Sequence, residues 1–278
     1  MSRMIQKLWP LLGKPFTFLR RDFIVATGYR LQFAGQFVTV LVSTFMFFSL
    51  SKLIDQDSSP YLIPYGGDYF SFVLIGVALS DFLLVSISTF AKEVRQAQMI
   101  GTFESMLVTP TAISAILFSS YLYPFFSSIL RMMLYFVIGW MFFDFQVNPD
   151  YLLLFIFTII VSILPFLGIG LISAAFIIAF KQGSPVTWLM GTFTGLLAGV
   201  MYPIAVLPDW VQTVSSIVPL TYGLEAIRMV FLQGATFSDI STELTILTLF
   251  AIVLLGLGLL TVHYSLRIAR RDGTLLHY

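Results

Sequence analysis

The sequence contains no cysteine, two histidines and few charged residues. The absence of cysteine excludes disulfide bridges, thiolate nucleophiles and cysteine metal sites. The two histidines, His263 and His277, lie too far apart in the sequence to suggest a pair of metal ligands. Only 10% of the 278 residues are charged and 58% are hydrophobic, a composition that indicates an integral membrane protein instead of a soluble domain.

Enzyme signatures are missing as well. The sequence has no G-x-x-x-x-G-K-[ST] phosphate-binding loop and no cluster of His, Asp or Glu typical of a membrane enzyme. The stretch "GIGLIS", residues 168–173, resembles part of a dinucleotide-binding fingerprint, but it lies within a long apolar stretch and no strand precedes it. We therefore predict no catalytic site, no metal, no cofactor held by this chain and no binding of nucleic acid.

Long apolar stretches dominate what is present. A bilayer core about 30 Å thick requires roughly 20 apolar residues per helix. Six stretches meet this length and predict an all-α integral membrane protein with six transmembrane helices, at residues 31–51, 69–91, 111–143, 151–180, about 186–206 and 244–266. A further apolar stretch, 210–224, is too short to cross and is followed by Glu225 and Arg228. We expect it to be re-entrant or interfacial on the outer side.

The positions of lysine and arginine predict the orientation. Most of the 15 basic residues precede the first span or follow the second, fourth and sixth, whereas the other side holds Lys52 and Arg228. Both termini are therefore expected in the cytoplasm of a multi-pass cell-membrane protein. No repeat or soluble domain is recognisable, so residues 1–278 should form one membrane domain, with a cytoplasmic arm at 1–30 and a cytoplasmic tail at 267–278.

The arm carries apolar residues at helical spacing. Ile5, Leu8, Trp9 and Leu12 form one stripe, with basic and polar residues beside it. This pattern predicts an amphipathic helix on the membrane surface. A loosely ordered basic tail held near anionic lipid is the alternative.

Two charges lie inside the predicted spans. Asp81 on the second span and Arg131 on the third both fall about 18–20 Å below the outer surface, at 1.5 Å per residue. A lone charge at that depth costs at least ~2.5–3.5 kcal/mol on insertion scales. We therefore expect Asp81 and Arg131 to form an intramembrane ion pair between adjacent helices. The alternative is that either group lines a watery pathway and contacts cargo.

Three glycines repeat in the predicted fifth span. Gly191, Gly195 and Gly199 are four residues apart, so on one helix they would form a smooth strip that allows another backbone to approach closely. The strip is expected to face another helix near the central pathway or a subunit interface. Tight packing within one subunit would explain the spacing equally well.

The connector between the second and third spans contains "GTFESMLVTP", residues 101–110. Over residues 92–109, Met99, Phe103, Met106 and Leu107 share one helical face, and polar residues lie mostly elsewhere. This predicts one short amphipathic helix in the cytoplasm. The pattern alone supports a partner contact and a solvated connector equally.

The connector resembles a segment of one transporter family. "GTFESMLVTP" is similar to the G-T-[LF]-E-x-x-L-x-x-P segment between the second and third spans of type-2 ATP-binding-cassette (ABC) exporter permeases. "MYPIAVLPDWVQTVSSIVPLTYGLEAIRMVFLQG", residues 201–234, is similar to that family's proline-rich exit from the fifth span, Leu-Pro-x-Trp turn, and Pro-Leu-Thr-Tyr followed by Glu-Ala-x-Arg. The two motifs lie in the family's order and on opposite sides of the membrane.

The resemblance implies roles for particular residues. In this family two permease subunits form the pathway, and two separate ABC nucleotide-binding subunits hydrolyse ATP with Mg. The helix between the second and third spans is the coupling helix, and the turn 181–185 is a smaller contact. The residues implied at the ATPase contact are Gln98, Gly101, Thr102, Phe103, Glu104 and Gly183.

The second motif implies a pair of outer re-entrant helices. The residues implied at this gate are Trp210, Pro219, Tyr222, Glu225 and Arg228. Glu225 and Arg228 are three residues apart, hence adjacent on a helix, and are expected to hold the turn near the membrane surface or to act in gating.

The resemblance thus implies the transmembrane subunit of an ATP-driven exporter. Such a subunit would move an amphiphilic, drug-like or lipid-linked substrate out of the cytoplasm or inner leaflet by alternating access. A homodimer surrounded by lipid is the expected assembly, because symmetric assemblies are the commonest, and a heterodimer is the alternative. A polysaccharide or O-antigen exporter permease remains an alternative function, as does a secondary transporter, for which the spans hold few ionisable groups.

Overall fold

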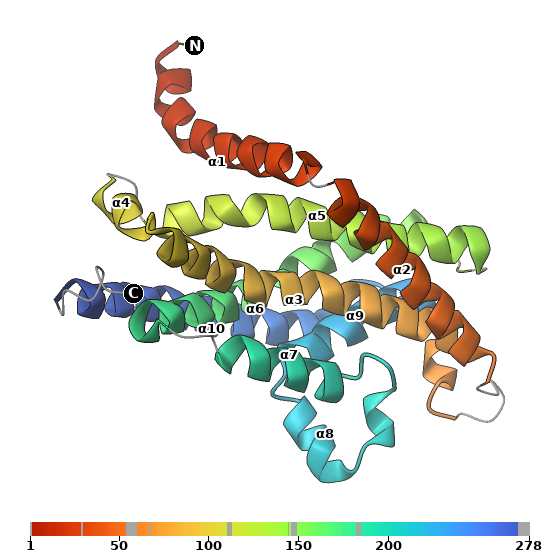
Figure 1. Cartoon of the computed structure of the whole chain (residues 1–278). Helices are drawn as coiled ribbons and strands as arrows, with labels where there is room; N and C mark the ends of the chain where they lie inside the picture. Colours follow the sequence, from red (N-terminus) through yellow and green to blue (C-terminus); the bar gives the residue numbers. More distant parts are fainter. Residues whose placement is uncertain are drawn as a thin grey trace.

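The structure is a computed structural model that describes residues 2–28, 30–53, 60–66, 68–109, 113–143, 145, 149–181 and 185–271. Every regular element among these residues is helical (Figure 1). The chain begins with α1 (Ser2–Gly28), which lies over α5 at one side of the bundle. The all-α class predicted from the sequence is confirmed for the described residues.

Five helices in the described residues are long and apolar enough to cross a membrane. They are α2 (Arg30–Ser51), α3 (Tyr69–Ile100), α5 (Ile113–Phe142), α6 (Leu152–Phe180) and α10 (Ser241–Arg271). They correspond to the predicted first, second, third, fourth and sixth spans. The second is longer than predicted, because α3 continues for nine residues beyond Ala91 and measures about 48 Å at 1.5 Å per residue.

Local capping fixes both ends of α3. Asp68 accepts hydrogen bonds from the backbone N–H groups of Phe70 (3.1 Å) and Ser71 (3.0 Å), which satisfies donors at the start of the helix. At the other end Gly101 adopts a left-handed conformation, φ 78°, and its N–H donates to the carbonyls of Ala97 and Gln98. Glycine takes this conformation without a Cβ penalty, so the helix ends there.

The predicted fifth span is wrong as a single helix. α7 (Pro185–Leu197) has 13 residues and is about 20 Å long, shorter than the ~30 Å hydrocarbon core. The chain then turns at Gly199, φ 72°, and forms the short 3-10 helix η4 (Ile204–Val206). The apolar composition continues through this region, but Gly199 and Pro203 end the helical backbone.

Two short helices follow α7. α8 (Asp209–Ser215) and α9 (Pro219–Gln233) meet at an angle of 91° across a short break. Pro219 occupies the first turn of α9, where its missing N–H costs no helical hydrogen bond. The bent pair is either a broken span or a re-entrant loop, so the described residues hold five or six candidate spans.

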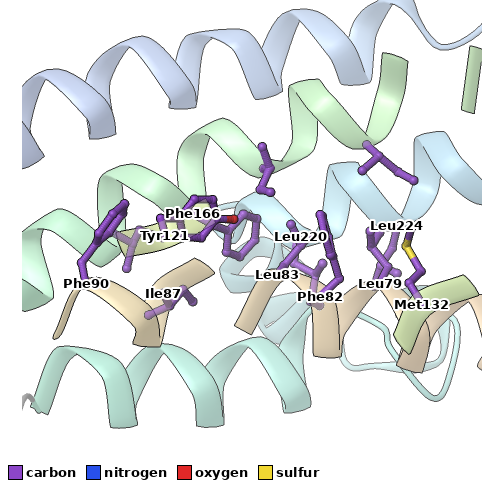
Figure 2. Packing of buried hydrophobic residues seen from close by; sticks show 14 of the residues in the cluster. Leu79, Phe82, Leu83, Ile87, Phe90, Tyr121, Met132, Phe166, Leu220 and Leu224 are labelled. Carbon is purple, nitrogen blue, oxygen red and sulfur yellow. The ribbon is translucent and has the colours of Figure 1, made fainter. Parts of the chain in front are cut away.

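α3 forms the centre of the bundle. Within its most apolar window 78% of residues are buried in the chain, against 22% for α2, α5 and α10. Figure 2 shows Phe82, Leu83 and Ile87 of α3 near Phe166 of α6 and Leu220 of α9. The long helices around α3 therefore leave much of their apolar surface outside this core.

Glycines allow α6 and α10 to pack closely. A Cβ added to Gly258 of α10 would lie 2.7 Å from the carbonyl oxygen of Gly168 of α6. A Cβ added to Gly170 would lie 2.6 Å from the carbonyl oxygen of Ser86 of α3. The glycines of the "GIGLIS" stretch thus serve helix packing, in agreement with its dismissal as a dinucleotide fingerprint.

Candidate functional site

The connector after α3 is built from two helices. The predicted single amphipathic helix over 92–109 is wrong, because α3 runs to Ile100 and a separate six-residue helix, α4 (Phe103–Val108), follows the turn at Gly101. Figure 1 shows α4 at the same end of the bundle as the C-terminal end of α10. Gly101 and Thr102 are exposed at this turn. The apolar pattern is amphipathic on both sides of the turn, but Gly101 interrupts the backbone.

α4 is held firmly against α3. Phe103 is 4% exposed and belongs to the main hydrophobic core, and Met106 packs against it. The backbone N–H of Thr102 donates to the carbonyl of Ala97 at 2.9 Å. Glu104 lies in the first turn of α4, directly after the buried Phe103. A displacement of α4 would therefore be transmitted to α3 through packed atoms.

The end of α3 also contacts the end of α6. Arg95 donates from Nη1 to the carbonyl of Lys181 at 2.5 Å, and Gln98 donates from Nε2 to the carbonyl of Ile177 at 3.5 Å. Lys181 caps α6 with φ 55°. The structure thus brings the α3–α4 junction close to the start of the 181–185 turn, the two segments implied at the ATPase contact. Gly183 lies outside the described residues.

Arg228 joins three segments at the opposite end of α3. Its side chain is 2% exposed and donates to the carbonyls of Gly199 (2.8 Å) and Val200 (2.9 Å) after α7, and of Phe72 (3.1 Å) in α3. The guanidinium carbon lies 3.4 Å from the centroid of the Phe72 ring, a cation–π contact. Arg228 therefore fixes α9 against α3 and the α7–η4 turn.

A glycine in α3 makes room for this arrangement. A Cβ on Gly76 would lie 2.7 Å from Nη2 of Arg228 and would overlap the carbonyl oxygen of Val200. Gly76 is thus the position at which α3 admits the buried guanidinium and its acceptors. The sequence alone gave no reason to single out Gly76, because it stands in the apolar pattern as one glycine among many.

Glu225 of α9 bonds a tyrosine outside its own helix. Glu225 and Arg228 form no ion pair within 4.0 Å, although both are described; instead the hydroxyl of Tyr65 donates to Oε2 of Glu225 at 2.8 Å. Tyr65 lies in the 3-10 helix η2 (Ile63–Tyr65), between α2 and α3. Burial, with a smaller contribution from the Glu225 carboxylate, raises the pKa of Tyr65, so its hydroxyl remains a donor at neutral pH.

The Tyr65 contact is open to a direct test. Tyr65→Phe removes the hydroxyl and leaves the ring, so we expect a loss of about 1.5–3 kcal/mol of unfolding free energy, typical of a hydrogen bond to a charged acceptor. Thermal unfolding of the purified protein in detergent measures it. Tyr61→Phe, on an exposed tyrosine of the same loop, is the matched control. Equal stability of the two variants would contradict the contact.

The other residues implied at the outer gate have different structural roles. Pro219 is buried at the start of α9, and the hydroxyl of Tyr222 donates to the carbonyl of Ser216 at 2.9 Å, across the 91° bend. Trp210 on α8 is 72% exposed. The bend is thus fixed by Pro219 and Tyr222, whereas the ring of Trp210 is exposed on the surface of the chain.

The glycine strip is not continuous. Gly191 and Gly195 lie on α7, but Gly199 lies beyond its end, in a left-handed turn, so the three do not share one helix face. A Cβ on Gly191 would lie 3.8 Å from Leu84, whereas one on Gly195 would meet no other packed group within 4 Å among the described residues. The carbonyl of Gly199 is instead an acceptor for Arg228.

The two intramembrane charges meet. Nε of Arg131 on α5 lies 3.3 Å from Oδ2 of Asp81 on α3, and the side chains are 23% and 36% exposed. The contact is electrostatic, because the Nε–H does not point at a hydrogen-bond acceptor. The hydroxyl of Tyr135, one turn along α5, lies close to Ser43 of α2. The polar groups of three helices therefore gather at one level of the bundle.

The described residues contain no group of three His, Asp or Glu side chains that could hold a metal ion.

The sequence model of a family described as "ABC-2 type transporter" matches residues 16–232, which is most of the chain. A search of curated proteins returned no match.

Proposed function

The chain belongs to the ABC-2 type transporter family, as a membrane permease subunit that works with a separate ABC ATPase, and we propose that it serves an ATP-driven exporter of amphiphilic, drug-like or lipid-linked compounds. It is a multi-pass membrane protein in which ATP hydrolysis belongs to the partner subunit. The substrate class is supported by the start of the chain, residues 20–37, which resembles the multidrug and lipid branch of the family more than the branch that exports polysaccharides.

In the proposed topology both termini face the cytoplasm and the membrane is crossed six times. α7 is the short fifth crossing. It begins just after Lys181, which Arg95 contacts at one end of α3. It leads to Gly199 and Val200, which Arg228 joins to Phe72 at the other end of α3. α8 and α9 then form a re-entrant pair on the outer side. An even number of crossings agrees with the basic residues at both ends of the chain.

The proposed membrane domain includes residues beyond the family match. α10 packs along α6, and Gly258 and Gly168 permit their close approach. We therefore assign α10 to the same domain, with residues 1–30 as the cytoplasmic arm and 267–278 as the tail. Two copies of the chain with two ATPase subunits form the proposed complex, a symmetric homodimer of permeases.

α4 is the proposed coupling helix. The observation that carries this role is the rigid junction: Phe103 is buried, Thr102 bonds Ala97, and the exposed Gly101 turn separates α4 from α3. ATP-dependent closure of the ATPase pair would shift α4, and the permease dimer would change its population of inward and outward arrangements. The amphipathic arm α1 and the 181–185 turn lie at the same proposed cytoplasmic side.

Glu104→Arg tests the coupling role. The reversed charge at the ATPase contact should lower transport and substrate-stimulated ATP hydrolysis by about tenfold, equivalent to about 1.4 kcal/mol. The rates are measured in liposomes that contain the permease with its ATPase. Membrane insertion and dimer formation should be retained, because Phe103 still anchors α4.

The matched control is Asp150→Arg, a charge reversal on an exposed residue just before α6. It should leave coupled hydrolysis near the wild-type rate. Wild-type rates for Glu104→Arg would argue that α4 is a solvated connector.

A further inference from the structure

A cavity of about 420 Å³ lies where α1, α3, α4 and α5 meet. α1 contributes Arg21 and Asp22, α3 contributes Glu93, α4 contributes Met106 and α5 contributes Tyr123. This volume is within the range of about 300–1,000 Å³ found for small-molecule sites. The cavity is separate from the Arg228 region at the other end of α3 and from the Asp81–Arg131 pair.

The charges in the cavity favour a cation. Nε of Arg21 lies 2.7 Å from Oδ1 of Asp22, so these two charges offset one another within the lining. Glu93 then supplies the excess negative charge; it is half-buried, and Ser120 of α5 lies close to its carboxylate. An opposite charge placed beside a half-buried carboxylate interacts more strongly than it would in water.

A neighbouring face of α3 differs in charge. Lys92 and Arg95 line a second cavity of about 540 Å³ that has no acidic residue in its lining. The neighbouring residues Lys92 and Glu93 therefore line two adjoining cavities of different charge, which share Gln96 and Ile100. The acidic cavity is the one in contact with α4.

The remaining lining suits an apolar body. Val25, Ala97, Ile100 and Met106 supply apolar surface, and Tyr123 supplies an aromatic ring, a group that can contact a cation through its face. A ligand that matches both parts carries one positive charge on a compact apolar frame. Small-molecule sites commonly combine a mostly apolar lining with a few polar groups that orient the ligand.

We propose that the cavity bounded by Glu93, Asp22 and Tyr123 binds a monovalent organic cation with an apolar body. The cation is either the ammonium headgroup of a lipid or a free amphiphilic amine, which share this chemistry. The site goes beyond the permease function, since binding there requires neither the ATPase subunit nor the central pathway.

Tetraphenylphosphonium and tetraphenylborate are the probes, because they have nearly the same shape and opposite charge. Binding is measured by equilibrium dialysis with the full chain in nanodiscs of phosphatidylglycerol, after subtraction of binding to empty nanodiscs. Tetraphenylphosphonium should bind the protein and tetraphenylborate should not. Glu93→Gln should weaken tetraphenylphosphonium binding about tenfold, equivalent to about 1.4 kcal/mol.

Two further variants complete the test. Ala26→Trp places a large side chain in the cavity from α1 and keeps Glu93 itself unchanged. It should abolish binding, which keeps the test decisive where Glu93→Gln fails to fold. Asp150→Asn, which removes an exposed carboxylate elsewhere, should bind as the wild type does. Equal binding of the two probes, or unchanged binding by both Glu93→Gln and Ala26→Trp, overturns the proposal. Because no ATPase is present, a negative result here is distinct from failure of the coupling experiment.

The lipid composition identifies the source of the cation. If phosphatidylcholine in place of phosphatidylglycerol lowers tetraphenylphosphonium binding to the wild type, after subtraction of binding to empty nanodiscs of the same lipid, a lipid ammonium headgroup occupies the cavity. If the specific binding is unchanged, the cavity takes the free cation.

Discussion

Arg228→Met is expected to destabilise the protein by about 3–5 kcal/mol and to abolish transport, because it removes the donors that serve the buried carbonyls of Gly199, Val200 and Phe72. Methionine fills a similar length but donates no hydrogen bond. The carbonyls that Arg228 serves would lose a partner in a region without solvent, and each such loss costs about 1–3 kcal/mol. Thermal unfolding in detergent and transport in liposomes measure the two effects.

Arg228→Lys separates charge from geometry. Lysine keeps the positive charge but cannot present two donor nitrogens in the planar fork that reaches Gly199 and Val200, so it should restore only part of the lost stability. Arg267→Met, on an exposed arginine of α10, serves as the control for the loss of charge alone. A stable, active Arg228→Met protein would show that the three segments hold together without the guanidinium.

Asp81→Asn and Arg131→Gln are each expected to lower the unfolding free energy by about 1–3 kcal/mol, while the double variant recovers much of the loss. Breaking a fully buried pair typically costs about 3–5 kcal/mol, and the effect is smaller here because both side chains are partly exposed. Removal of one partner leaves the other charge uncompensated inside the membrane.

A double-mutant cycle gives the coupling energy of this pair. Residues in contact typically show interaction energies of about 0.5–3 kcal/mol, which the cycle isolates from the separate effects of each substitution. Unfolding of the four proteins in detergent supplies the values. Strict additivity of the two penalties would mean that Asp81 and Arg131 act independently, as expected of groups that line a watery pathway.

The span boundaries were predictable where charge or capping coincides with a change in composition. α6 starts at Leu152 and ends at Phe180, almost as the apolar stretch does, because Asp150 and Lys181 lie at its ends. The extent of α3 was underestimated, since the helix continues past Lys92 through residues that are polar but helix-compatible. α7 was overestimated, because a count of apolar residues does not register the turn at Gly199.

The partners of individual polar residues were predictable only where the cost of burying an unpaired charge restricts the possible pairings. Asp81 and Arg131 could be paired from the sequence because a lone charge in lipid is costly and their depths match. The partners of Arg228 could not, since Phe72 lies 156 residues away and carbonyl acceptors carry no sequence signal. Tyr65 was missed for the same reason: a single tyrosine in a loop gives no indication that it bonds Glu225.

The uninterrupted length of α3 makes it a lever arm. From the Asp68 cap to the turn at Gly101 no glycine hinge with a left-handed backbone and no proline interrupts its 32 residues. At 1.5 Å per residue, a tilt of about 10° about one end would sweep the other through roughly 8 Å. Arg228 bonds the carbonyl of Phe72, near the end of α3 that is remote from α4. Such a tilt of α3 would therefore also displace α9 and the turn after α7.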